Sequence, residues 1–212
     1  MQALWYHTRM FSRPWEDGHR QLLEDIFTNH DRVLDIGGGL RVDSSRNNRG
    51  DQNAWLKPHL EHIEYVILDK VADYNPDIVG DIHDLPLPDN SEEAILCFAV
   101  LEHVEEPQQA VREIHRVLKP GGVAYLYAPF LFYYHPMPGY YKDYFRFTRD
   151  GWEYMTKDFS EVSLQNVRGP IATACNLIPF LAKRTRWIDT LDRWFGKLGS
   201  DQTSGYYVYC KK

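Results

Sequence analysis

The sequence has 212 residues, enough for one domain with a substantial core, and its hydrophobic (43%) and charged (25%) fractions are ordinary for a globular protein. Its formal net charge of -6 gives no general attraction to nucleic acid, whose binders usually carry a basic surplus, so nucleic acid is not an expected substrate. The cysteines Cys97, Cys175 and Cys210 are too scattered for a disulfide framework or a thiolate metal site, as expected in a reducing cytoplasm.

No stretch of the sequence predicts membrane insertion. The first residues lack the apolar core of a secretory signal. The longest apolar stretch, residues 123–134, contains Pro129 and is far shorter than the roughly 18 to 20 residues that span a bilayer. We therefore expect a cytoplasmic protein.

Residues 15–29 predict the first helix, because Leu23, Ile26 and Phe27 recur at helical spacing. The aromatic residues ahead of it, 5–14, are open to two interpretations. They either fold over a cofactor pocket as a lid or pack on the surface.

Residues 32–39, RVLDIGGG, predict a buried inner strand that ends in an acid and three glycines. Glycines let the backbone turn sharply and approach a ligand, which in an open α/β sheet binds at the carboxyl end of such a strand. A nicotinamide site requires a further glycine where Val42 stands, and it usually has no acid at the position of Asp35. The pattern D-x-G-x-G, with Gly37 and Gly39, therefore disfavours that class of site.

The next residues, 41–53, are almost all polar or glycine and predict a loop, followed by a short helix over 55–60. Residues 64–69, EYVILD, predict the second strand, which again ends in an acid. Asp69 is placed there to accept both ribose hydroxyls of a bound nucleoside, or else only to cap a turn. Residues 78–80 predict a third strand, after which Asp81 is placed to accept an adenine amino group.

Two more strands, 94–99 and 123–128, are separated by a helix that runs from Val104 to Leu118 and that Gly121 and Gly122 are expected to end. Strands that alternate with helices predict a Rossmann-like, doubly wound, mostly parallel sheet with helices on both faces. Residues 159–167 and 206–211 predict strands six and seven, the last one antiparallel at the sheet edge.

Residues 171–198 predict two amphipathic helices that split near Pro179 or Thr185. They are expected to cover the sheet or form a lid over the acceptor. Tryptophans and basic residues in this segment also suit a membrane surface, which we do not favour, or a dimer interface.

The run DIVGDIHDLPLPDNSEEAILCFAVLEHVEEP, followed by EIHRVLKPGG, resembles the type 11 group of class I S-adenosylmethionine-dependent methyltransferases, and the match extends over about residues 33–159. The resemblance implies a single methyltransferase domain over 1–212, with S-adenosylmethionine as its cofactor. Residues 1–31 would form the N-terminal helix or lid and 32–129 the cofactor-binding core. Residues 130–204 would form the acceptor-side loop and helical insertion, and 205–212 the last strand.

The resemblance also implies roles for residues at the strand ends. Gly37 and Gly39 would wrap the methionine part of the donor, and Asp35 would steady their turn and approach the donor's amino group. Asp69 would hold the ribose and Asp81 the adenine. The remaining two implied contacts are Ile82 against the adenine ring and Phe98 on the floor near the sulfonium.

Some O-methyltransferases of quinone biosynthesis and small-RNA methyltransferases carry E-x-x-E-H at the end of the fourth strand and bind a divalent cation there. This chain has Ala99 in place of the first glutamate. Glu102 and His103 would then need a distant third and fourth ligand. We therefore expect no metal.

The segment PFLFYYHPMPGYYKDYFRFTRDGW resembles the acceptor-side segment that follows the fifth strand in some type 11 bacterial methyltransferases. Methyl transfer to a hydroxyl needs an in-line approach and removal of a proton. His135 is the first candidate to accept that proton and His103 the second, because an imidazole titrates near physiological pH. The acceptor-binding candidates are Tyr134, Tyr141, Asp143, Tyr144 and Arg146.

Arg146 has a second interpretation, in which it pairs with Asp143 and only pins the loop. The predicted function is metal-independent methyl transfer from S-adenosylmethionine to a small-molecule or lipid- or glycan-linked acceptor, with oxygen as the expected acceptor atom. The alternatives are an inactive nucleoside-binding module and, less favoured, a nicotinamide-dependent oxidoreductase. The sequence names neither the acceptor nor the oligomeric state.

Overall fold

The structure is a computed structural model that describes residues 14–42, 51–178 and 185–212. Nearly all of the expected lid, residues 5–13, lies outside the described residues, as do residues 43–50 of the polar loop and the expected break at Pro179.

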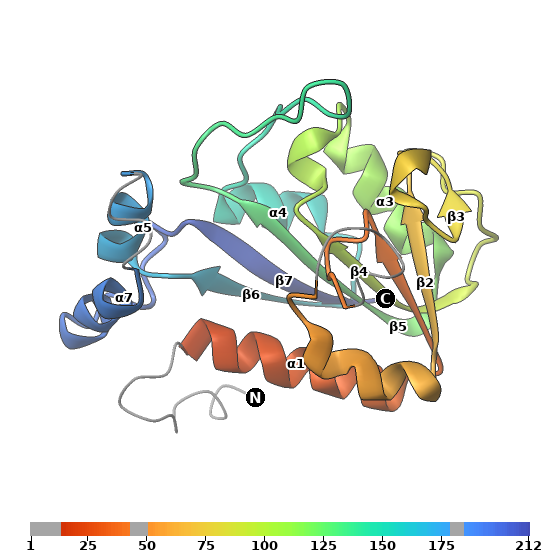
Figure 1. The fold of residues 1–212 in the computed structure, drawn as a ribbon, viewed down its shortest axis with the longest axis horizontal. Coiled ribbons are helices and arrows are strands. Elements are labelled where there is room, and N and C mark those ends of the chain that lie inside the picture. The colour runs from red at the N-terminus through yellow and green to blue at the C-terminus, as the bar shows by residue number, and fades with distance from the viewer. Residues whose placement is uncertain (1–13, 43–50, 179–184) are drawn as a thin grey trace.

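A seven-stranded sheet forms the centre of the fold, with the strand order β3-β2-β1-β4-β5-β7-β6 (Figure 1). The strands β1 to β5 run parallel to one another, whereas β7 runs antiparallel to both β5 and β6. The bounds are β1 (Arg32–Ile36), β2 (Glu64–Asp69), β3 (Ile78–Val79), β4 (Glu92–Phe98), β5 (Leu118–Pro129), β6 (Glu161–Val167) and β7 (Gly205–Lys211). The Rossmann-like sheet with an antiparallel last strand is confirmed.

The last strand does not lie at the sheet edge, which corrects that part of the prediction. β7 pairs along its whole length with β5 on one side and with β6 on the other. Strand β6 is therefore the edge. Inserting β7 between two strands that point the other way satisfies its backbone hydrogen-bonding groups on both sides.

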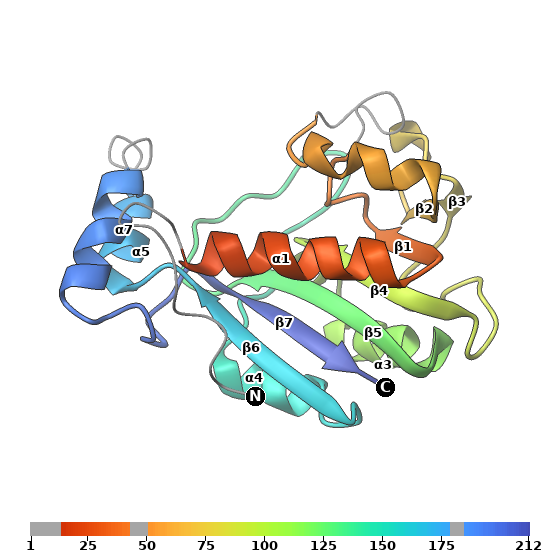
Figure 2. The ribbon, with the colours of Figure 1, turned by 90° about the horizontal axis from the view of Figure 1, so that it is seen from below.

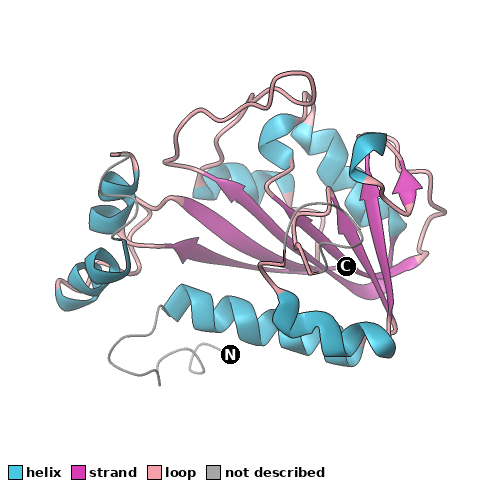
Figure 3. Cartoon of the chain, in the orientation of Figure 1, coloured by secondary structure: helices cyan, strands magenta, loops and turns pink. Residues whose placement is uncertain are grey.

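Helices cover both faces of the sheet (Figure 3). Figure 2 shows α1 running across one face, with α3 and α4 behind the strands. The bounds are α1 (Pro14–Asn29), α3 (Pro107–Val117), α4 (Arg149–Met155), α5 (Pro170–Asn176) and α7 (Thr185–Trp194), with the 3-10 helices η1 (Ala54–Glu61), η2 (Ala72–Tyr74) and η3 (Leu101–His103).

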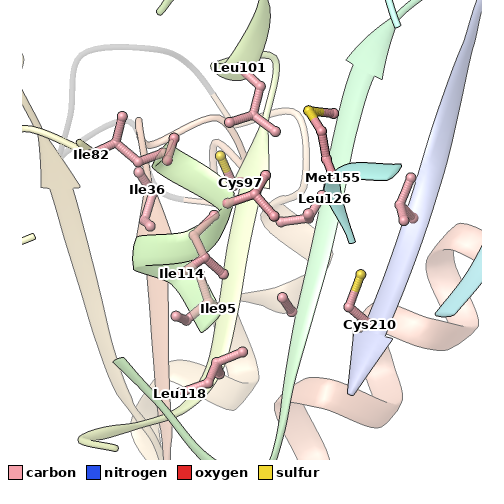
Figure 4. Close-up of a cluster of buried hydrophobic side chains, with 14 of the residues drawn as sticks. Ile36, Ile82, Ile95, Cys97, Leu101, Ile114, Leu118, Leu126, Met155 and Cys210 are labelled. Carbon is pink, nitrogen blue, oxygen red and sulfur yellow. The ribbon is translucent and has the colours of Figure 1, made fainter. Parts of the chain in front are cut away.

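The two faces bury separate clusters of apolar side chains. Successive residues of a strand point to opposite faces, so Val33 of β1 joins the cluster under α1, and Leu34 joins the cluster under α3. In the second cluster, Cys97 of β4 and Leu126 of β5 lie close to Ile114 of α3, and all three are fully buried (Figure 4). This double coverage explains why the inner strands are apolar without alternation.

The helix after β4 differs from its prediction at both ends. It begins at Pro107, not Val104, and proline suits a first helical position because the N–H that it lacks would have no partner within the helix there. It ends at Val117, and Gly121 and Gly122 lie inside β5. The register between β4 and β5 shifts there, and a Cβ on Gly122 would come within 2.9 Å of a carbonyl oxygen of β4.

The helices α5 and α7 confirm the expected pair within residues 171–198. They pack against each other beyond the ends of β6 and β7 rather than over a face of the sheet (Figures 1 and 2). Asp192 of α7 is buried and accepts hydrogen bonds from the backbone N–H groups of Ile171 (2.9 Å) and Ala172 (2.8 Å) at the start of α5. Among the described residues, no helix is long and apolar enough to cross a bilayer.

Candidate active site

The glycine turn after β1 is held by the buried carboxylate of Asp35. Its Oδ2 accepts a hydrogen bond from the Tyr65 hydroxyl at 2.6 Å and one from the backbone N–H of Leu40 at 3.2 Å. Asp35 therefore ties the turn to the strand beside it.

At the first and third glycines of the turn, neighbouring atoms leave no room for a Cβ. Gly37 has a φ of +81°, and a Cβ there would lie 2.3 Å from a methyl carbon of Val100. A Cβ on Gly39 would lie 2.3 Å from the backbone oxygen of Phe98. The turn thus packs directly against the end of β4.

A cavity of about 850 Å³ is lined by residues at the carboxyl ends of β1 to β4 and by residues 136–142 and Tyr144 of the long loop between β5 and α4. That volume is within the usual range for small-molecule and cofactor sites. Seven of the predicted site residues line the cavity: Gly37, Asp69, Asp81, Ile82, His103, Tyr141 and Tyr144. The other seven are not among its lining residues: Asp35, Gly39, Phe98, Tyr134, His135, Asp143 and Arg146.

The two strand-end acids differ in their partners. Asp69 is 8% exposed, and its Oδ1 accepts a hydrogen bond from the backbone N–H of Val71 at 2.9 Å. Asp81 pairs with the ammonium of Lys70 at 2.6 Å and with the ring of His83 at 2.6 Å. Burial opposes ionisation of Asp81, but its hydrogen bonds from His83 and Lys70 prevail and lower its pKa to about 2. Asp81 therefore already carries a paired charge at the cavity wall.

Two tyrosines from distant parts of the chain meet above the cavity. The rings of Tyr74 and Tyr140 are stacked, with centroids 5.4 Å apart and planes at 19°. The Tyr74 hydroxyl donates to the sulfur of Met137 at 3.1 Å. The acceptor-binding candidates included tyrosines of this loop, but nothing in the sequence indicated that Tyr74, after β2, contacts the loop.

The two predicted proton acceptors lie beside Glu102, which is fully buried on η3. The Nε2 atoms of His103 and His135 each lie 3.8 Å from Oε1 of Glu102. Burial raises the pKa of Glu102 to about 8. Burial also lowers the pKa of His103, which lies at the cavity wall, whereas His135 lies behind it.

Arg146 holds the loop together, as its second interpretation required. Its guanidinium makes a bidentate pair with Asp143, with N–O distances of 2.5 and 2.7 Å. It also donates to the backbone oxygen of Tyr133 at 2.7 Å. This pair holds the pKa of Asp143 near 2. Tyr134, in contrast, is 73% exposed.

Phe98 lies on the other face of the sheet from the cavity lining. Its ring belongs to the cluster under α1, with centroid distances of 5.7 Å to His19 and 5.2 Å to Tyr125. His19 stacks on Tyr207 at 4.3 Å, and burial lowers its pKa to about 4. No sequence pattern predicted this aromatic cluster, because helix and strand residues meet there only in the folded chain.

The comparisons with known proteins find similarity to methyltransferases. The model of the methyltransferase domain family Methyltransf_11 matches residues 52–126. A 2-methyl-6-phytyl-1,4-hydroquinone methyltransferase of Oryza sativa is 31% identical over 110 residues, which cover 46% of this chain and 31% of the relative. The ubiquinone/menaquinone biosynthesis C-methyltransferase UbiE of Vibrio campbellii is 35% identical over 101 residues, covering 43% of this chain and 38% of the relative.

Both matches therefore span well under half of the relatives' own length. The crystal structure of an S-adenosylmethionine-dependent methyltransferase from Archaeoglobus fulgidus has the same fold along nearly the whole chain. It superposes with a TM-score of 0.56 at 16% identity, over 93% of this chain and 94% of that one.

Proposed function

The chain carries a class I S-adenosylmethionine-dependent methyltransferase domain of the type 11 group, and we propose that its cavity binds S-adenosylmethionine and delivers the methyl group to a small-molecule acceptor. One observation carries the proposal. The glycine turn and the two strand-end acids, far apart in the sequence, line one cavity of suitable volume. The proposed unit is the single domain 1–212.

Donor binding is proposed to follow the order of the strands. Gly37 offers close backbone approach to the methionine part, and Asp69 accepts the ribose hydroxyls. Ile82 packs against the adenine, whose amino group shares Asp81 with Lys70. Asp35 and Gly39 act indirectly by fixing the turn. Because the ring of Phe98 points to the other face, the cavity-lining residues Ala99 and Val100 form the floor near the sulfonium in its place.

The acceptor is proposed to enter between η3 and the loop between β5 and α4. The ring of Tyr141 lies 4.4 Å from that of His103, and both line the cavity. These groups would orient an acceptor in line with the sulfonium, and an imidazole would help to remove a hydroxyl proton. Arg146 and Asp143 position this loop, with Tyr144 bonded through its hydroxyl to Glu105 at 2.6 Å.

The chemical class of acceptor is proposed from the rim of the cavity. Three exposed side chains of this loop line the cavity: Met137, Tyr140 and Tyr144. They favour an apolar or aromatic acceptor, including a lipid-linked one, over a charged one. Oxygen is the first acceptor atom proposed. Ring carbon is the second, because the two relatives above are named for methyl transfer to hydroquinones or as a C-methyltransferase.

Calorimetric titration of the purified protein with S-adenosylmethionine, S-adenosylhomocysteine and NADH tests the donor site. We expect both sulfur nucleosides to bind and NADH not to bind. Asp69→Ala removes hydrogen bonds to a charged group, about 1.5–3 kcal/mol, which corresponds to a roughly 10- to 150-fold loss of affinity. Asp25→Ala, at an exposed position on α1, is the matched control.

Binding of NADH alone would indicate an oxidoreductase instead. Donor binding without methyl transfer to any hydroquinone, phenol or lipid-linked acceptor would favour the inactive module. Methyl-labelled donor with product analysis separates oxygen from carbon transfer, because an O-methyl ether and a C-methyl ring differ in their carbon chemical shifts.

A further inference from the structure

Glu102 is a buried carboxylate for which the described residues supply no hydrogen bond at either oxygen. Buried polar groups are normally paired, and an ionised carboxylate costs several kcal/mol to bury alone. Oε1 faces the Nε2 atoms of His103 and His135, each at 3.8 Å. The ligand atoms of these three residues all lie within 4.8 Å of one another.

The other nitrogen of each imidazole faces oxygen acceptors. Nδ1 of His103 lies 2.6 Å from the backbone oxygen of Lys142. Nδ1 of His135 lies 3.0 Å from the backbone oxygen of Tyr133 and 3.2 Å from Oδ2 of Asp143. A guanidinium nitrogen of Arg146 is farther from this atom, at 3.4 Å.

These contacts fix the tautomers. Nδ1 carries the proton in both rings, so both Nε2 lone pairs point toward Glu102. Holding a ligating histidine through its second nitrogen is how proteins orient imidazoles around a metal. When a cation keeps Glu102 ionised, its carboxylate and the two Nε2 lone pairs form three electron-pair donors that converge on one point.

We propose that Glu102, His103 and His135 form a binding site for a divalent transition-metal cation. Two imidazoles and one carboxylate suit Zn²⁺, Fe²⁺, Co²⁺ or Mn²⁺, whereas Mg²⁺ and Ca²⁺ prefer ligand sets made of oxygens. Donor atoms bound at about 2.0–2.2 Å in a tetrahedron lie about 3.4 Å apart, so the 3.8 Å spacings need to close by only a few tenths of an ångström.

This site reverses the sequence-based expectation of no metal. That expectation rested on the missing glutamate at Ala99 and on the need for distant ligands. The loop after β5 brings His135 to the other two residues, because Arg146 and Asp143 clamp it in place and the backbone N–H of His135 donates to Asp143 at 2.8 Å. The sequence separation hid the third ligand.

Three protein ligands leave coordination positions open, and His103 lies at the cavity wall. A bound cation would therefore be positioned to accept an oxygen ligand from that side. In that case the two histidines act on an acceptor through the ion rather than by taking its proton themselves. The site itself stands independently of the proposed methyl transfer, since it can be loaded without donor or acceptor.

The test is calorimetric titration of EDTA-treated, full-length protein with Mn²⁺, Co²⁺ and Zn²⁺, with Mg²⁺ for comparison. We expect one site per chain for the transition metals and at least ~10-fold weaker binding of Mg²⁺. Visible absorption of the Co²⁺ form reports nitrogen and oxygen coordination directly. Glu102→Gln keeps the shape of the side chain, and His135→Gln changes a half-buried position, so at least one variant is expected to fold.

Both variants are expected to lose more affinity than the ~10- to 100-fold that follows loss of an outer-shell partner. His115→Gln, at a half-buried histidine on α3 outside the cluster, is the matched control and should bind as the parent does. Absence of transition-metal binding by the parent overturns the proposal. So does binding that survives unchanged in the folded variants. If the metal titration shows no binding while S-adenosylmethionine still binds, only the metal site is overturned and the proposed function is not.

Discussion

The ring of Tyr74, at the end of η2, stacks on the ring of Tyr140 in the loop after β5, with centroids 5.4 Å apart. This contact joins the donor end of the cavity to the acceptor loop. Such aromatic pairs contribute about 0.5–1.5 kcal/mol.

Loss of the stack is expected to weaken donor binding with little effect on folding, because Tyr140 is exposed. Tyr140→Ala should raise the dissociation constant for S-adenosylmethionine by roughly 2- to 10-fold. Tyr140→Phe, which keeps the stack, should bind as the parent does. Calorimetry on Tyr74→Ala, Tyr140→Ala and the double variant isolates the pair, and strictly additive effects would show that the two rings do not act together.

The clamp between Arg146 and Asp143 predicts a loss of stability. Arg146→Met leaves a carboxylate whose side chain is fully buried without its guanidinium partner, and this is expected to lower the free energy of unfolding by about 3–5 kcal/mol. Arg146→Lys should retain only part of this stability, since an ammonium cannot form the bidentate pair. Urea unfolding measures the free energy of unfolding of both variants. Arg112→Met, at an exposed arginine of α3, is the control, and an equal cost in the two methionine variants would refute the clamp.

His19 predicts a pH dependence of stability. Its pKa falls from 6.5 in the unfolded chain to about 4 in the folded chain. Between these two pH values, His19 is protonated mainly in the unfolded chain. Stability from this group is complete above pH 6.5 and declines as the pH falls toward 4, by about 3 kcal/mol in total. His19→Phe keeps a ring for the stack on Tyr207 but has no proton to bind.

The comparison is made by denaturant unfolding at intervals between pH 7 and pH 4. The stability of the parent relative to His19→Phe should fall by about 3 kcal/mol as the pH falls from 7 to 4. A constant difference across that range would mean that His19 has the same pKa in the folded and the unfolded chain.

Gly39 predicts a steric penalty at the donor turn. A Cβ there meets a backbone oxygen of β4, which cannot rotate away, so Gly39→Ala is expected to cost about 1–3 kcal/mol and to reduce donor affinity. Gly199→Ala, where a Cβ meets nothing within 4 Å, should be close to neutral. Thermal unfolding with and without S-adenosylhomocysteine checks both, and equal effects of the two substitutions would contradict the close packing of the turn.

The features that the sequence predicted correctly are local ones. An acid or glycine that follows an apolar strand must lie at that strand's carboxyl end, so Gly37, Asp69 and Asp81 could be placed at one edge before their contacts were known. The doubly wound, mostly parallel sheet also followed from alternating strands and helices. The edge strand did not, because nothing local distinguishes β6 from β7 as the outer strand.

The sequence did not predict which face of the sheet a side chain takes, or which residues far apart in the chain come into contact. Phe98 was expected at the cavity floor, but an inner strand is apolar on both sides, so its pattern does not say which face a given side chain takes. The partnership of His135 with Glu102 joins two strand-end loops, and only the folded path of the acceptor loop brings them together. Lys70 pairing with Asp81 was missed for the same reason.

A crystal structure of the protein with S-adenosylhomocysteine is the decisive test of the proposed donor site. We expect the ribose within hydrogen-bonding distance of Asp69, the adenine beside Ile82 and the homocysteine chain over Gly37. A nucleoside bound elsewhere, or a cavity that stays free of nucleoside at saturating concentration, would contradict it.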